Sequence, residues 1–238
     1  MKRIAKLGMA FVLVFGAFGT GTAIASATSK SVAAAQKASA GEKALSKAFA
    51  AFAKVKSFAY DATLTVTTNG EKIQTKMTGE HILKPKEAFK VTTIMTYDGQ
   101  KMQTSMIQAN DKLYIQLPDT SEWTESELTD SPSDISQSDQ VFDQGLLKVY
   151  DKIALKKAGT DQEITMTVDP KKYAELYEDS SIKKLTVKYT IDGKTSLPKK
   201  MTMSMESDEQ GETLKTSMIY TFKSINKVKP IKAPTVAQ

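Results

Sequence analysis

The chain has 238 residues, of which 40% are hydrophobic and 25% charged, a composition typical of globular and not of disordered proteins. It contains no cysteine, so we expect no disulfide bond, no zinc–thiolate site, no thiol nucleophile and no lipid attached through a cysteine. Lys and Arg outnumber Asp and Glu by 33 to 27, which gives a formal net charge of +6.

Residues 1–27 have the organisation of a secretory signal peptide. Lys2, Arg3 and Lys6 form a basic start, residues 7–18 are apolar, and Ala25-Ser26-Ala27 forms a cleavage site before Thr28. The apolar stretch is short for a membrane-spanning helix, so a retained N-terminal anchor is the less favoured alternative. We therefore expect an exported protein, extracellular or associated with the cell wall.

Cleavage of this segment would halve the formal net charge of the protein. It removes three positive residues and no acid, which lowers the formal net charge from +6 to +3. It also removes Arg3, the only arginine, and with it the side chain best suited to bidentate phosphate contacts. We therefore expect no nucleic-acid partner. No later apolar run reaches membrane length, so we also expect no stable membrane span after cleavage.

The chain from residue 28 begins with a linker or frayed helix start (28–41), followed by a single domain (42–228) and a flexible tail (229–238). Leu45, Phe49, Phe52 and Val55 recur at helical spacing and predict an amphipathic helix that ends near Lys56. Hydrophobic and polar residues then alternate, which predicts five strands around 60–67, 73–83, 89–97, 102–106 and 113–117. Asn69-Gly70 and Asp98-Gly99 provide tight turns between them.

Residues 118–140 interrupt this alternation. The segment is polar, contains seven acids and no lysine, and carries Trp123, the only tryptophan. We interpret it as either a lid or a mobile loop. A second helix is predicted from Phe142 to Ile153, and a short one after Asp169-Pro170. Further strands are predicted around 164–168, 185–191, 201–205 and 214–222.

Methionine is concentrated in the predicted strands. Nine methionines remain after the signal peptide, and they lie on the apolar side of their strands. Methionine is flexible and polarisable and suits surfaces that receive variable apolar partners, although it also fills gaps in ordinary cores. If Met106 faces inward, we expect Met106→Lys to cost roughly 3 kcal/mol or more. The candidate ligand-binding residues are Leu64, Met77, Phe89, Met95, Met106, Ile115, Trp123, Met203 and Met218.

Catalytic and metal-binding signals are weak. His81 is the only histidine, and its position on an apolar strand face indicates a neutral, partly buried side chain. No nucleotide-binding, zinc-protease or serine-hydrolase motif is present. Three alternatives stay open: a pair of carboxylates acting on glycans, a calcium site in the acidic segment, and a Cu(I) site at Met201, Met203 and Met205. We expect a non-enzymatic protein without metal or cofactor.

The order of signal peptide, helix, antiparallel meander, polar segment, helix and further meander resembles that of the LolA/LppX-type half-barrels. The stretches Tyr189–Lys194 and Leu197–Met201 also resemble an uncharacterised exported family of Firmicutes, often lipoproteins, with this architecture. The resemblance implies an α+β fold in which a strongly curved antiparallel sheet, a half-open barrel, wraps two or three helices. It also implies a lipid or other hydrophobic ligand on the concave face and a Gram-positive cell envelope. This chain departs from the lipoprotein members because it has no cysteine.

An alternative to ligand binding is an envelope-associated protein-interaction module. Such a module would have an interior filled by its own helices and no hydrophobic ligand.

Overall fold

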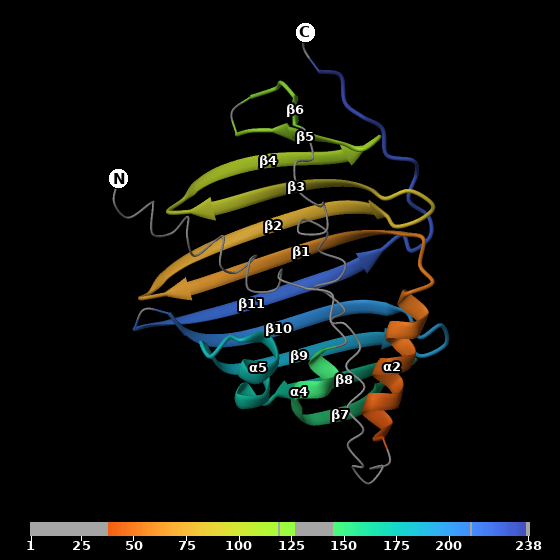
Figure 1. Cartoon of the computed structure of the whole chain (residues 1–238), viewed down its shortest axis with the longest axis vertical. Helices are drawn as coiled ribbons and strands as arrows, with labels where there is room; N and C mark the ends of the chain where they lie inside the picture. Colours follow the sequence, from red (N-terminus) through yellow and green to blue (C-terminus); the bar gives the residue numbers. More distant parts are fainter. Residues whose placement is uncertain (1–37, 119, 127–144, 210, 237–238) are drawn as a thin grey trace. The chain divides into compact units, whose positions relative to one another are not determined.

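A computed structural model describes residues 38–118, 120–126, 145–209 and 211–236, and those from Ser39 onward belong to one compact unit. Its main element is an eleven-stranded antiparallel sheet (Figure 1). The strand order is β6-β5-β4-β3-β2-β1-β11-β10-β9-β8-β7. The sheet is open, with β6 and β7 at its edges, and three helices accompany it in the described residues. The predicted α+β half-open barrel is therefore confirmed.

The strands and helices have the following bounds: α2 (Ala40–Phe52), β1 (Ser57–Thr68), β2 (Glu71–Ile82), β3 (Ala88–Tyr97), β4 (Gln100–Ala109), β5 (Lys112–Gln116), β6 (Thr124–Ser126), α4 (Leu146–Val149), β7 (Tyr150–Ala158), β8 (Asp161–Val168), α5 (Pro170–Tyr177), β9 (Ile182–Asp192), β10 (Pro198–Glu209) and β11 (Glu212–Lys223).

The sheet is built from two meanders that meet at β1 and β11. Each strand otherwise pairs with its neighbours in sequence, and the β1–β11 pairing runs from Ala59↔Lys223 to Thr67↔Lys215. The predicted β1–β2 and β3–β4 turns are confirmed, because Asn69-Gly70 and Asp98-Gly99 all have positive φ. Short turns of this kind set the register of each hairpin and therefore the face on which each side chain lies.

The predicted helix at 142–153 is much shorter than expected. α4 ends at Val149, and Tyr150 already begins strand β7, which pairs with β8. A register irregularity between Tyr150 and Lys152 interrupts the alternation at the start of this strand. Because that irregularity breaks the period of two, the sequence pattern mimicked a continuing helix.

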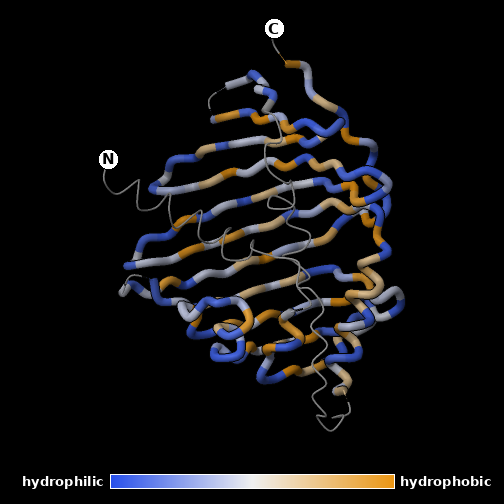
Figure 2. Tube along the Cα trace, viewed as in Figure 1, coloured by the Kyte–Doolittle hydropathy of each residue, from blue (hydrophilic) through white to orange (hydrophobic). Residues whose placement is uncertain are grey.

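The sheet has one hydrophobic and one polar face, and Figure 2 shows the alternation along its strands. The inner face carries rows of hydrophobic residues opposite one another, for example Met77, Ala62, Tyr220, Met201 and Tyr189. The outer face carries mainly Thr, Ser and Lys. All nine methionines outside the signal region lie on the inner face.

The helices lie on the inner face, mainly against the strands near the β7 edge of the sheet. α2 begins with a capping box, in which Ser39 and Glu42 bind each other's backbone N–H. α2 packs on β7 and β8, whereas α5 packs on β9 and α4. Within α2, Leu45 is fully buried, and the Phe49 ring meets Tyr189 of β9 edge-on at a centroid distance of 6.1 Å.

The C-terminal segment packs on the outer face. Ile231, Ala233 and Val236 lie against a cluster of Ile107, Ala109 and Tyr114. Asn226 holds the start of this segment, because its side-chain oxygen accepts from the Lys56 N–H at 2.7 Å. The sequence suggested a flexible tail at 229–238, and three of its hydrophobic residues lie in this cluster.

Candidate functional site

Eight of the nine predicted ligand-binding residues lie on the inner face of the sheet. The strand registers pair Leu64 with Met218 and Met218 with Met203, while Met106 lies opposite Ile115. The other three inner-face positions are Met77, Phe89 and Met95. The strand alternation therefore placed these side chains on one surface, although they come from seven strands.

Trp123 lies apart from the other eight. It precedes β6 and packs with the outer-face cluster of Ile107, Ala109 and Tyr114. This cluster lies on the outer face, whereas Met106 and Ile115 lie on the inner face, because neighbouring residues on a strand point to opposite sides of the sheet. Of the segment 118–140, interpreted as a lid or a mobile loop, Pro118 and residues 120–126 are described, and the other positions lie outside the described residues.

The inner face is buried in one part and accessible in another. Leu64, Met77, Phe89 and Met203 are buried. By contrast, Met95, Met106, Ile115 and Met218 are half-buried. The accessible part continues to Met102, which is 45% exposed, and to Leu117 at the end of β5, which is 58% exposed.

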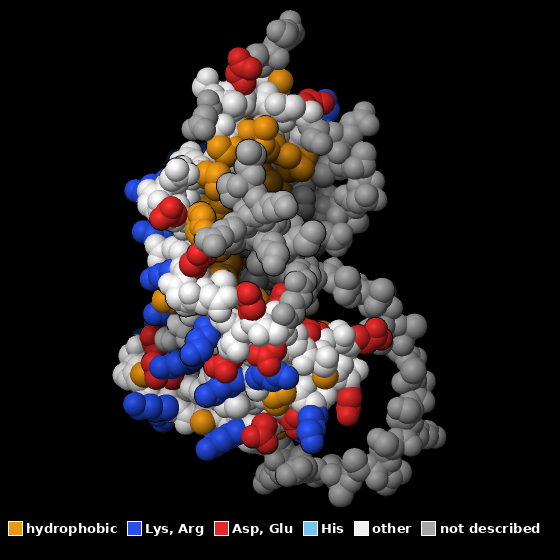
Figure 3. Space-filling view, turned by 90° about the vertical axis from the view of Figure 1, so that its left-hand side faces the viewer, with side chains coloured by type: hydrophobic (Ala, Val, Ile, Leu, Met, Phe, Trp, Pro, Cys, Tyr) orange, Lys and Arg blue, Asp and Glu red, His pale blue; other side chains and the backbone are white. Residues whose placement is uncertain are grey.

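We call Met95, Met102, Met106 and Ile115 the apolar patch. They lie on neighbouring strands β3, β4 and β5, where Met95 faces Met102 and Met106 faces Ile115. The described helices pack mainly on β7, β8 and β9, and Phe52 at the end of α2 also meets Phe58 of β1 and Phe222 of β11. In Figure 3 hydrophobic side chains gather in the upper half of the view, at the height where Figure 1 shows the strands β1 to β5. The inner face therefore extends beyond the area that these helices cover.

Two tyrosines stack on the inner face. The rings of Tyr60 and Tyr220 stack at a centroid distance of 4.7 Å, and both are almost fully buried. Burial raises the pKa of both hydroxyls, so both stay neutral at physiological pH. The Tyr60 ring lies over Gly79, where a Cβ atom would come within 2.4 Å of it. Gly79 therefore makes room for this pair of rings.

His81 occupies one end of the inner face. It is 4% exposed, lies 5.5 Å from the Phe58 ring, and its Nε2 lies 3.0 Å from Glu87 Oε1. Within the described ranges, no three His, Asp or Glu side chains gather as a metal site would require. A single His–Glu pair among aromatic rings is a structural contact.

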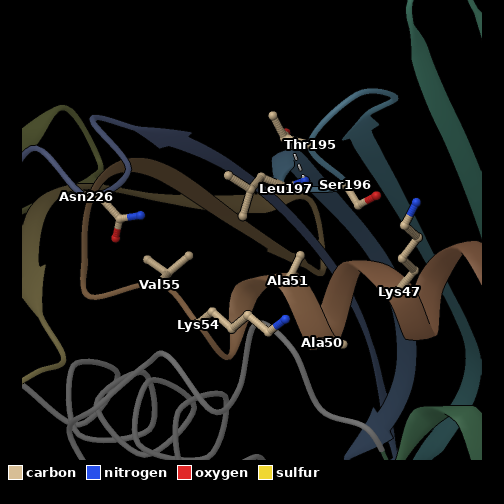
Figure 4. A pocket seen from close by; sticks show the side chains of 9 residues that line it. All are labelled: Lys47, Ala50, Ala51, Lys54, Val55, Thr195, Ser196, Leu197 and Asn226. Atoms are coloured by element: carbon tan, nitrogen blue, oxygen red, sulfur yellow. Dashed lines mark hydrogen bonds between the residues drawn. The ribbon is translucent and has the colours of Figure 1, made fainter.

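Two shallow pockets lie where the strands β1, β3 and β5 begin. One, of about 410 Å³, lies between the C-terminal half of α2 and the β9–β10 connection (Figure 4), and Lys47, Lys54 and Leu197 line it. The other, of about 360 Å³, lies beside the β2–β3 connection and is lined by Lys84, Pro85 and Ile231 among others. Sequence reasoning did not find them, because they form from loops that no periodic pattern connects.

Comparisons with known proteins support the fold. The model of a family of unknown function, DUF6612, matches residues 152–238. Among curated proteins, none matches the sequence. The lipoprotein LppX of Mycobacterium tuberculosis superposes with a TM-score of 0.52 at 14% identity, covering 80% of this chain and 97% of LppX. LprF of Mycobacterium bovis also gives 0.52, at 10% identity, with 82% and 96% covered.

None of the helices in the described ranges has both the length and the hydrophobicity that crossing a membrane requires. The similarity to LppX and LprF extends over nearly the whole of both proteins and over most of this chain. At these identities it concerns the fold alone. The fold is similar to that of LppX and LprF, in agreement with the resemblance to the LolA/LppX-type half-barrels.

Proposed function

We propose that this protein is exported and binds a lipid or another hydrophobic molecule on the inner face of its sheet, without catalysing a reaction. The observation that supports this most strongly is the apolar patch, which continues the hydrophobic inner face beyond the area covered by the helices. Apolar side chains that stay accessible on one face of a folded domain are typical of binding sites.

The chemistry of the patch matches an acyl chain. The inner-face positions of β3 and β4 carry no charged residue, only Phe, Val, Thr, Met, Tyr and Gln. An acyl chain on this surface would therefore meet no desolvated charge. The methionines adapt their three rotatable bonds to chains of different shape. In this proposal Leu64, Met77, Phe89 and Met203 form the base of the site, and Met95, Met106, Ile115 and Met218 contact the ligand.

The proposal on export depends on residues 1–27, whose basic start, apolar stretch and cleavage site are typical of a signal peptide. The similarity to a lipoprotein such as LppX is consistent with a location in the cell envelope. Secretion, with the mature chain beginning at Thr28, is checked by N-terminal sequencing of protein from the culture medium and the wall fraction.

Ligand binding is tested by mass spectrometry of organic extracts and by displacement of a fluorescent fatty acid from the purified protein. We expect a co-purifying lipid and saturable displacement. Met106→Lys places a charge in the patch and should weaken binding at least about tenfold. Gln103→Lys is the matched control, because Gln103 is exposed on the outer face of the same strand. Met102→Lys, at a 45% exposed position, provides a second patch variant if Met106→Lys folds poorly.

Absence of both lipid and saturable displacement contradicts the proposal, as does equal binding by the patch and control variants. The first result would favour the alternative, an envelope-associated interaction module whose interior is filled by its own chain.

A further inference from the structure

The two ends of the sheet differ in charge. Because the strands are antiparallel, the connections before β1, between β2 and β3, between β9 and β10, and after β11 lie at the same end (Figure 1). We call this the basic end. The connections at the opposite end include Asp98-Gly99, the residues before β6, and the α5 segment between β8 and β9.

The basic end is rich in exposed lysine. Lys54 and Lys56 lie before β1, Lys84 and Lys86 between β2 and β3, and Lys194 between β9 and β10. The segment after β11 adds Lys227, Lys229 and Lys232, and all eight side chains are exposed.

Few acids offset this charge. In the connections at the basic end, the described acids are Glu87 and Asp111. Asp111 pairs with Lys86 at 2.5 Å, and Glu87 lies against His81. In the named connections of the opposite end the balance is reversed, with six described acids and two lysines, both on α5. The charge asymmetry therefore runs along the strands and is not a property of the net charge alone.

Hydrophobic side chains lie among these lysines. The pocket of about 410 Å³ combines Lys54 with Val55 and Leu197, and the pocket of about 360 Å³ combines Lys84 with Pro85 and Pro230. In Figure 4 the first pocket is bounded by side chains from α2, from the β9–β10 connection and by Asn226. A basic surface with shallow apolar grooves matches a lipid, which presents an anionic head group beside apolar glycerol and acyl groups.

We propose that the basic end docks on a membrane surface that contains anionic phospholipid. The lysines come from separate connections across the end of the sheet, so they match a layer of phosphates better than one peptide segment. Arginine, which binds the carboxylates of a protein partner in a bidentate manner, occurs only at Arg3. Each lysine near such a surface strengthens binding by about fivefold at moderate salt.

The proposal is tested by co-sedimentation with vesicles. The protein used in this experiment begins at Thr28, because the apolar residues 7–18 would themselves insert into lipid. This start keeps every described helix and strand, because all of them begin after residue 37. Vesicles of phosphatidylcholine with about a third phosphatidylglycerol are compared with pure phosphatidylcholine at low and high salt. We expect binding to the anionic vesicles only, weakened by salt.

Two matched variants locate the surface. The basic-end variant changes Lys54, Lys194, Lys229 and Lys232 to Gln, and none of these side chains forms a described ion pair. The control variant removes the same charge from the outer face towards the opposite end, at Lys72, Lys101, Lys184 and Lys215.

We expect the basic-end variant to bind anionic vesicles at least about tenfold more weakly than the unmodified chain, and the control variant to change by about threefold or less. Equal weakening by both variants would overturn the proposal, because net charge alone would then explain binding. Absence of vesicle binding would also overturn it and would direct the search to an acidic protein. Neither result depends on whether the inner face binds a ligand.

Discussion

The inner face of the sheet has two parts with the same chemistry and different cover. On β8 and β9, Met166 and Tyr189 are fully buried, and the helices pack over this side. On β4, Met102 lies on the same face but is 45% exposed. Methionine in a strand therefore indicates the inner face in both places, and the described helices cover only part of that face.

The largest effect is expected from Met166→Lys, in the covered part. The side chain is fully buried, so the lysine charge would lose its hydration with no acid opposite it in the β8–β9 pairing. We expect a loss of about 3 kcal/mol or more in the free energy of unfolding, measured by urea denaturation. Unchanged stability would contradict the register that places Met166 beneath the helices.

Leu45→Ala tests the helix that covers this part. Leu45 is fully buried on α2, and its truncation leaves a cavity, so we expect a loss of about 2–4 kcal/mol. Ala50→Gly, on the pocket-lining side of the same helix, controls for backbone effects and should cost about 1 kcal/mol. If the two variants cost the same, α2 does not contribute to the core through Leu45.

Gly79→Ala tests the stacked tyrosines between the two parts. The new Cβ would lie within 2.4 Å of the Tyr60 ring, which is packed against Tyr220 and cannot move freely. We expect a loss of about 1–3 kcal/mol in thermal or urea unfolding. The penalty should shrink when Gly79→Ala is combined with Tyr60→Leu. An undiminished penalty in the double variant would show that the ring is not the obstacle.

Met106→Lys tests the accessible part. The sequence suggested a cost of about 3 kcal/mol or more, but Met106 is half-buried, and a lysine there can extend its ammonium group into water. We now expect about 1 kcal/mol in urea unfolding, together with the loss of ligand binding described above. A cost equal to that of Met166→Lys would mean that the two parts of the inner face are equally covered.

The smallest effect concerns pH and the start of α2. Hydrogen bonds from Tyr150 and from the Ser39 backbone and side chain lower the pKa of Glu42. A pKa lowered by folding stabilises the protein above the unfolded-state pKa, and the benefit disappears as the pH falls through the folded-state pKa. Stability should therefore fall less between about pH 5 and pH 3 in Glu42→Gln than in the unmodified chain. Identical pH profiles would contradict this role.

Much of the sheet could be predicted from the sequence because its signals are local. Strand alternation and the turn at Asn69-Gly70 fix which side chains share a face, and this placed eight candidate residues on one surface. Trp123 could not be placed in this way, because it lies in the connection before β6, outside any strand alternation, and packs against the cluster of Ile107, Ala109 and Tyr114.

The basic end, and the boundary between the covered and the accessible part of the inner face, could not be predicted from the sequence either. Both depend on which connections the topology brings together, and lysines as far apart as Lys54 and Lys232 meet at one end only after the two meanders join. The start of β7 was missed for a different reason, since the irregularity after Tyr150 hides the period of two.

The central claim is that a hydrophobic ligand lies on the accessible part of the inner face. Photo-crosslinking with a diazirine-bearing fatty acid, followed by peptide mapping, tests it most directly. The account predicts that the label concentrates in peptides from β3, β4 and β5, at Met95, Met102, Met106 and Ile115, and that excess unlabelled lipid suppresses it. Label confined to the outer face, or spread evenly and not suppressed by competitor, would contradict it.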